Sequence, residues 1–169
     1  LGGVVVSNSA RVAGNTIDED IATFIKKKFN LIIGERMAEE IKITVGSAIP
    51  LEKPLVLEVR GRDVHSGLPR SIEVGSREIT EAIKGTLEMI VVAIKKVLED
   101  TPPELGSDII DKGIVLSGGT SQLRNFSTFV SRLTGVPAHV ADDPLLCVVK
   151  GTGIALEHID LYKRNLVKR

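Results

Sequence analysis

The chain has 169 residues, the length of about one domain. Its 22 basic and 22 acidic residues give a formal net charge of zero, which argues against a nucleic-acid binder and a polybasic membrane binder, since both need an excess of positive charge. Hydrophobic residues make up 43% and charged residues 26%, so we expect a folded chain with a buried core rather than a disordered or membrane-spanning one.

Up to residue 75 the sequence predicts short strands and two helices. The valines of residues 3–13 are typical of two short strands around a polar turn. Apolar residues that recur at the 3.6-residue period then predict helices over residues 16–29 and 35–45. Prolines exclude a continuation of the second helix, and strands are expected over residues 55–60 and 70–74.

Beyond residue 75 the longest apolar stripe predicts a helix over residues 77–100, with Ser76 as its N-cap. The shorter elements that follow are a helix over residues 104–111, a strand over 113–117, a helix ending at Gly135 and a strand over 138–141. A last helical region runs from residue 144 into a basic tail, and Gly151 and Gly153 are expected to divide it. This alternation predicts the α/β class, with residues 14–75 as a small inserted subdomain.

One segment combines a buried strand, two glycines and the start of a helix, namely GIVLSGGTSQL at residues 113–123. Gly118 and Gly119 let a ligand approach the backbone, and Thr120 or Ser121 is available to cap the helix that follows. The segment has neither the Lys-Ser or Lys-Thr pair of a P-loop nor the GxGxxG pattern. Because glycines at such turns often serve only the turn itself, a purely structural role stays open.

A second candidate is the polar face of the helix over residues 35–45, which carries Glu35, Glu39 and Lys42. Carboxylate and ammonium groups on one face can hydrogen-bond a ribose or a purine edge, although a salt-bridged surface helix has the same pattern. The adjacent Asp142 and Asp143 fit a turn better than acid–base catalysis, so no catalytic residue is assigned. The histidines lack the spacing of metal ligands, and no metal site is assigned.

Several strings together resemble known families. The string GIVLSGGTSQLRN at residues 113–125 resembles the adenosine motif of the actin and sugar-kinase superfamily. The strings that resemble, in order, the MreB family of bacterial actins are VAGNTIDEDI, GERMAEEIK, EVRGRD, GLPRSIE, TPPEL and ADDPLLCVVKGTGIALE. The resemblance runs from residue 1 to about residue 160 and corresponds to the second half of such a protein.

The resemblance implies an actin-like ATPase fold that binds ATP in a cleft between two halves. Residues 1–13 and 76–169 would form a larger subdomain with an RNase H-like sheet, and residues 14–75 a smaller inserted α+β subdomain. The helix residues that the resemblance implies as purine and ribose contacts are Glu39, Glu40 and Lys42. The turn residues that it implies beside the sugar and the α-phosphate are Gly118, Gly119, Thr120 and Ser121, with Thr120 standing where MreB proteins usually have a third glycine.

The resemblance also implies how the whole family protein works. Such proteins are slow ATPases that form cytoplasmic, membrane-associated filaments and act with the cell-shape and cell-wall synthesis machinery. Hydrolysis needs Mg²⁺, clamps on the β- and γ-phosphates and a positioned water. The phosphate loops, the catalytic carboxylate and the membrane-contacting segments are expected in the half of the family protein that precedes Leu1. We therefore expect the chain alone not to hydrolyse ATP.

The alternative is a protein of a different class. The chain would then be a structural or filament-interaction module that adds to filaments or caps them without binding nucleotide. The turn over residues 61–69 is its expected contact region.

Overall fold

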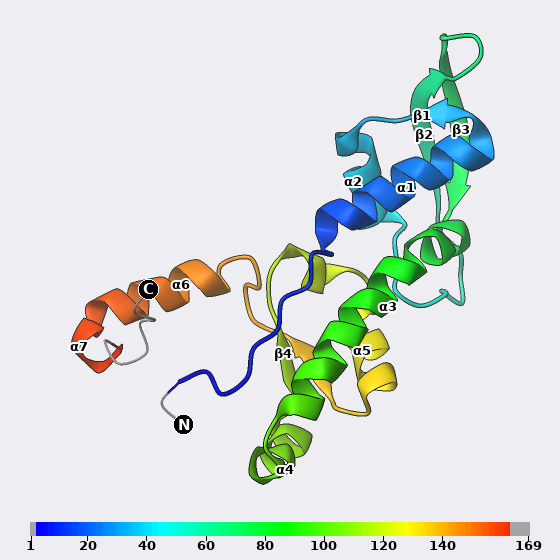
Figure 1. Cartoon of the computed structure of the whole chain (residues 1–169). Helices are drawn as coiled ribbons and strands as arrows, with labels where there is room; N and C mark the ends of the chain where they lie inside the picture. Colours follow the sequence, from blue (N-terminus) through cyan, green and yellow to red (C-terminus); the bar gives the residue numbers. More distant parts are fainter. Residues whose placement is uncertain (1–2, 163–169) are drawn as a thin grey trace.

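The computed structural model describes residues 3–162, so the basic tail lies outside the described residues. The helices are α1 (Gly14–Phe29), α2 (Glu35–Thr44), α3 (Ser76–Asp100), α4 (Pro103–Lys112), α5 (Phe126–Thr134), α6 (Cys147–Glu157) and α7 (Ile159–Tyr162), with a 3₁₀ turn at Gly119–Gln122 (Figure 1). The strands are β1 (Leu31–Ile32), β2 (Val56–Asp63), β3 (Pro69–Gly75), β4 (Ile114–Leu116) and β5 (Ala138–Val140). The α/β class expected from the sequence is confirmed.

One end of the molecule is a three-stranded antiparallel sheet in the order β1-β2-β3. Its hairpin pairs Val56 with Gly75 and Arg62 with Pro69, which is why both strands exceed their predicted bounds. Val59 and Val74 point to the buried side of the hairpin. The helices α1 and α2 pack against each other beside this sheet (Figure 1).

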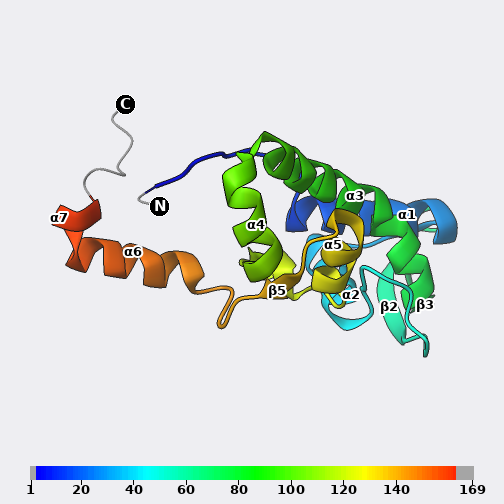
Figure 2. The ribbon, with the colours of Figure 1, turned by 90° about the horizontal axis from the view of Figure 1, so that it is seen from below.

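The other end contains a parallel pair of strands, β4 and β5, joined through α5. Parallel strands need such a crossover, because the chain must return to the same edge before it can pair again. The long helix α3 contacts β3 and α1 at one end of the molecule and α5 at the other (Figures 1 and 2). It therefore belongs to the packing of both ends.

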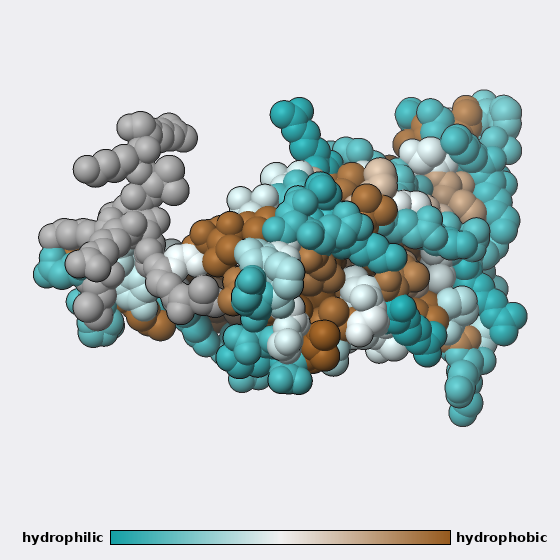
Figure 3. Space-filling view, turned by 60° about the horizontal axis from the view of Figure 1, so that its bottom comes forward, coloured by the Kyte–Doolittle hydropathy of each residue, from teal (hydrophilic) through white to brown (hydrophobic). Residues whose placement is uncertain are grey.

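The buried apolar residues form one continuous cluster that reaches from the antiparallel sheet to β4. Its largest fully buried side chains on α1 and α3 are Ile17, Ile21, Ile25, Ile79, Ile83 and Leu87. Isoleucine and leucine thus fill the volume that aromatic residues occupy in many cores, since aromatic residues make up only 3% of the chain. Figure 3 shows hydrophobic surface across the middle of the molecule, among mostly hydrophilic residues.

The two strands predicted over residues 3–13 are wrong. The described part of this segment is extended but unpaired, and the side chain of Val4 is 85% exposed. Its backbone runs beside α3, where the Asn8 side-chain amide donates to the Ala93 carbonyl at 3.5 Å (Figure 1). A strand needs a hydrogen-bonded neighbour, and none lies against this segment among residues 3–162.

Two local predictions also need correction. Ser76 is the first residue of α3 rather than its cap, which is Gly75, and the Ser76 hydroxyl instead accepts a hydrogen bond from the Leu55 N–H at 3.0 Å. The last helical region is not divided at Gly151 or Gly153, because α6 continues through both and ends before His158. Two glycines lower helix propensity without forcing a break.

The helix α6 extends away from the rest of the molecule (Figures 1 and 2). Several of its apolar side chains are exposed, among them those of Val148, Val149, Ile154 and Leu156. Among residues 3–162, no helix combines the length and the apolar composition needed to cross a bilayer.

Candidate functional site

A cavity of about 670 Å³ opens where the start of α1, the flank of α2 and the glycine turn after β4 meet. We call it the junction pocket. Its lining residues are Gly14, Asn15, Glu39, Lys42, Ile43, Gly119, Thr120, Gln122, Leu123, Arg124 and Leu145. The two segments singled out in the sequence, which are about 80 residues apart, therefore face one cavity.

The flank of α2 supplies the charged groups of the junction pocket. Ala38 and Ile41 turn the apolar face of α2 into the core, which leaves Glu39 and Lys42, one turn apart, at the edge of the cavity. The Lys42 ammonium pairs with the Asp18 carboxylate of α1 at 2.8 Å. Both side chains are about 15% exposed, at 15% and 16%, so the pair is well shielded and holds the Lys42 stem in place.

A second cavity, of about 470 Å³, lies between α1 and α2 and shares Asn15 and Glu39 with the junction pocket. Its other polar lining residues are Asp18, Glu19, Glu35 and Arg36. The Asp18 Oδ1 atom is buried and has no hydrogen-bond partner within residues 3–162. The surplus of carboxylates makes this side unfavourable for phosphate groups, which fit better toward the glycine turn.

The glycine turn forms the opposite wall. Gly118 has a φ of +85°, and its N–H donates to the Pro144 carbonyl at 2.8 Å, which brings the segment after Asp143 over the turn. A Cβ placed on Gly119 would lie 3.5 Å from Leu145 Cδ2. The backbone of the turn is thus open on the side that faces the cavity, with Leu145 as an apolar neighbour.

Close approach between the walls also depends on Gly14, at the start of α1. A Cβ on Gly14 would lie 3.2 Å from Thr120 Oγ1 and 3.6 Å from Lys42 Nζ. The first of these distances is tighter than an ordinary contact, so the missing side chain keeps the cavity open.

The remaining predicted site residues lie outside the junction pocket. The Ser121 side chain is buried, and its hydroxyl donates to the Gly118 carbonyl at 2.6 Å, so both residues shape the turn from behind. Glu40 is exposed and lines neither of the two cavities described above. The predicted helix cap at Thr120 or Ser121 is wrong, because the chain makes a 3₁₀ turn there and α5 begins only after Asn125.

Seven lining residues were not among the predicted site residues, namely Gly14, Asn15, Ile43, Gln122, Leu123, Arg124 and Leu145. Gly14 and Asn15 interrupt the apolar pattern just before the helix predicted over residues 16–29, so the sequence does mark their position. No pattern in the sequence marks Leu145, because it reaches the cavity only through the hydrogen bond from the Gly118 N–H to the Pro144 carbonyl.

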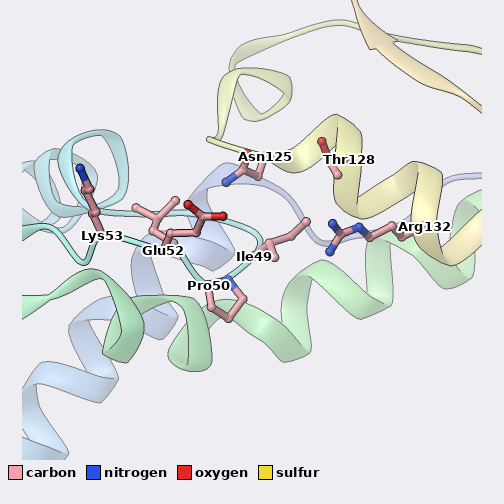
Figure 4. A pocket seen from close by; sticks show the side chains of 8 residues that line it. Ile49, Pro50, Glu52, Lys53, Asn125, Thr128 and Arg132 are labelled. Atoms are coloured by element: carbon pink, nitrogen blue, oxygen red, sulfur yellow. The ribbon is translucent and has the colours of Figure 1, made fainter.

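A third groove, of about 440 Å³, lies between α5 and the loop after residue 48 (Figure 4). Figure 4 shows Arg132 and Thr128 on α5 across from Pro50, while Lys53 lies at the far end of the groove. This groove is open and its charged groups do not converge on one point.

Among the described residues, no cluster of three or more His, Cys, Asp or Glu side chains is arranged to hold a metal ion.

The chain is similar to known proteins over nearly its whole length. Residues 1–164 match the family model described as MreB/Mbl protein. The chain is 48% identical over 167 residues to the cell shape-determining protein Mbl of Bacillus cereus, and 45% identical over 166 residues to the cell shape-determining protein MreB of Escherichia coli. Each alignment covers 98% of this chain but 50% and 48% of the relative. The chain thus spans about half the length of the curated relatives it matches.

Solved structures show the same likeness. The crystal structure of MreB5 of Spiroplasma citri bound to ADP superposes with a TM-score of 0.89 at 35% identity, covering 95% of this chain and 49% of that one. The AMPPNP-bound form gives 0.88 at the same identity, covering 97% and 49%. A MamK double helical filament gives 0.73 at 21% identity, covering 86% and 44%, which supports the fold alone.

Proposed function

The chain belongs to the MreB/Mbl family of actin-like, cell shape-determining proteins, and from this premise we propose that it supplies the adenosine-binding half of an ATP cleft. The observation that carries the proposal is the junction pocket, where Glu39 and Lys42 face Gly119 and Thr120 across one cavity. Its volume of about 670 Å³ lies in the usual range for small-molecule sites. The ADP-bound and AMPPNP-bound MreB5 structures support a nucleotide as the ligand.

The chemistry of the walls fits an adenosine. Lys42 offers N–H donors and Glu39 a carboxylate acceptor, which suit ribose hydroxyls and a purine edge. Ile43 and Leu145 line the same cavity and offer apolar contacts to the faces of a purine. The exposed backbone at Gly119 suits the α-phosphate side. Glu40 does not line the cavity, so its proposed contact with the purine or ribose rests on the family resemblance alone.

We assign the rest of the ATPase cycle to the complete family protein. Because the chain spans about half of its relatives, Mg²⁺ binding, the clamps on the β- and γ-phosphates and hydrolysis are proposed to need the other half. The chain alone is proposed to bind ATP more weakly than the complete protein, because the phosphates lose most of their donors. We further propose the division into residues 14–75 and the two flanking segments as subdomains.

The test is an ATP titration of this chain followed by amide chemical shifts. Gly119→Val places an isopropyl group in the junction pocket, next to Leu145, and we expect it to weaken binding by roughly tenfold or more. Gly106→Val is the matched control, because Gly106 lies in α4 and lines no part of the pocket. Apart from its own neighbours along α4, no atom of the described residues lies within 4 Å of the position that its Cβ would take. ATP affinity that is equal in wild type and Gly119→Val would contradict the proposed site.

We also propose that the family protein forms membrane-associated cytoplasmic filaments that work with cell-wall synthesis, and that this chain contributes a filament contact. The turn between β2 and β3 supports such a contact, because Val64 and Leu68 are exposed there, Leu68 at 65%. This surface also favours the second candidate, a filament-interaction module without nucleotide binding.

Light scattering by a full-length relative, with and without this chain added, tests the contact. We expect the wild-type chain to change the assembly curve, and Leu68→Glu to reduce that effect. Unchanged assembly with the wild-type chain would exclude the filament contact. A changed curve from a chain that binds no ATP would favour the second candidate.

A further inference from the structure

Arg124 follows the glycine turn and lines the junction pocket, yet its hydrogen bonds run to the backbone at the end of α2. The Arg124 guanidinium donates to the Thr44 carbonyl at 3.3 Å and to the Gly46 carbonyl at 3.4 Å. The Arg124 carbonyl accepts from the Ala48 N–H at 2.8 Å, within a parallel bridge between Ser47 and Arg124. One residue thus binds the segment after α2 through both its side chain and its backbone.

The segment that Arg124 holds is tightly folded against α2. The Gly46 N–H donates to the carbonyls of Ile41 and Lys42, both at 3.1 Å. A Cβ on Gly46 would lie 2.2 Å from the Lys42 carbonyl oxygen, so the backbone is too close for any side chain. The last carbonyls of a helix carry partial negative charge and lack partners within the helix, which suits a guanidinium. A shift of Gly46 would therefore move the turn of α2 that carries Lys42.

Behind this contact lies Ser47, which is fully buried. The Ser47 hydroxyl donates to the Ile49 carbonyl at 2.6 Å and accepts from the Asn125 amide at 3.1 Å. The Thr80 hydroxyl of α3 donates to the Ser47 carbonyl at 2.9 Å. Figure 4 shows Asn125 at the start of α5, on the other side of the groove from Ile49. Ser47 is thus hydrogen-bonded both to α3, through Thr80, and to the N-cap of α5, Asn125.

We propose that Arg124 is a positioning residue for the junction pocket. By tying the end of α2 to the residue that follows the glycine turn, it sets the spacing between Lys42 and Thr120 without bonding the ligand. The inference rests on the proposed function, because it states how the geometry of that same site is kept. Arg124→Ala removes both side-chain bonds, whereas Arg124→Lys keeps a cation that can reach the same carbonyls.

The first test is residue-resolved amide hydrogen exchange in the free chain. In Arg124→Ala we expect the amides of Gly46 and Ala48 to exchange about tenfold faster, with partial rescue in Arg124→Lys. The amides of Ile21 and Leu87, in the core of α1 and α3, are the internal reference and should not change. Unchanged exchange at Gly46 and Ala48, or an equal increase at all four amides, would overturn the proposal.

A control variant separates positioning from general destabilisation. Thr86→Val removes the hydrogen bond between the Thr86 hydroxyl of α3 and the Asp20 carboxylate of α1, away from the end of α2. We expect it to lower the unfolding midpoint while the exchange rates of Gly46 and Ala48, relative to the core amides, stay as in wild type.

The second test compares adenosine, ADP and ATP as probes. A positioning role predicts that Arg124→Ala weakens all three by the same factor, about tenfold. A loss that grows from adenosine to ATP would mean that Arg124 contacts phosphate directly, and would overturn the proposal. If the wild-type chain bound none of the three, the proposed function would fail. If the wild type bound them and Arg124→Ala bound equally well, only the inference about Arg124 would fail.

Discussion

Glu78 connects three parts of the molecule through one carboxylate. Its Oε2 atom accepts from the N–H of Gly75, the N-cap of α3, at 2.9 Å, and its Oε1 atom accepts from the Lys28 ammonium at the end of α1. Partial burial raises the pKa of the Glu78 carboxyl, but the bonds from Lys28 and Gly75 together lower it more, so the pKa lies below its ordinary value of 4.5. The ionised form is therefore the one that the fold stabilises.

The first prediction concerns this carboxylate. Because the pKa is lower in the folded chain, the stabilisation is fully present above about pH 4.5 and is lost as the pH falls through the folded-state pKa. We expect the free energy of unfolding of Glu78→Gln to fall less than that of wild type between about pH 5 and pH 3. Urea unfolding at a series of pH values measures this difference.

Glu81→Gln is the control, since it removes the same charge from an exposed position of the same helix. A wild-type acid dependence in Glu78→Gln would show that the Glu78 bonds do not stabilise the fold.

At the level of elements, the helices could be predicted from the sequence because each presents an apolar stripe to one core. The strands β2 and β3 could be predicted because the prolines before them exclude helix. The two-residue strand β1 was missed, since Leu31 and Ile32 carry no alternating pattern of their own and pair only because β2 extends to Asp63. The segment before α1 has strand-like valines but no partner, and no local pattern reveals that.

The candidate site was predictable to a similar extent. Glu39, Lys42, Gly119 and Thr120 face one cavity, and each stands in a string whose chemistry could be read locally. Leu145 and Arg124 could not be identified, because their place depends on hydrogen bonds between segments far apart in the chain. Whether the predicted residues bind a nucleotide stays a prediction.

The second prediction concerns α6, which continues through two glycines. Apart from the neighbouring residues of α6, no atom of the described residues lies within 4 Å of a Cβ built on Gly151 or Gly153, and neither glycine has a positive φ. Alanine at both positions should therefore stabilise α6 by about 0.5–1 kcal/mol per site, through the lower entropy of the unfolded chain. Slower amide exchange within α6 and a stronger helical circular dichroism signal measure the effect.

Gly135→Ala provides the contrast, because Gly135 ends α5 with a φ of +75°. We expect this variant to be less stable than wild type by about 1 kcal/mol, since a Cβ disfavours the left-handed region. Loss of helix in the Gly151→Ala and Gly153→Ala variants would mean that these glycines are needed by α6.

At the scale of the whole molecule, the two sheets share one core. The third prediction follows from Leu87, which is fully buried on α3 and belongs to the cluster that reaches both ends of the molecule. Leu87→Ala should destabilise the chain by about 2–5 kcal/mol and should do so equally at both ends. Amide exchange at increasing denaturant, followed at Val59 in β2 and at Leu116 in β4, measures both ends at once.

An exposed position supplies the comparison. Val148→Ala, on the exposed side of α6, should change the stability by less than about 0.5 kcal/mol. If Leu87→Ala weakened protection at Val59 while leaving Leu116 unchanged, the two ends would unfold independently.

The length of α3 has a mechanical consequence. Its 25 residues extend over about 37 Å, since each residue of a helix advances 1.5 Å along the axis. A tilt of about 5° at the first turn, beside β3, would displace the last turn, before α4, by roughly 3 Å. The helix therefore acts as a stiff rod between the hairpin and α4. A tilt imposed at either end displaces the other end by more than most side-chain adjustments could absorb.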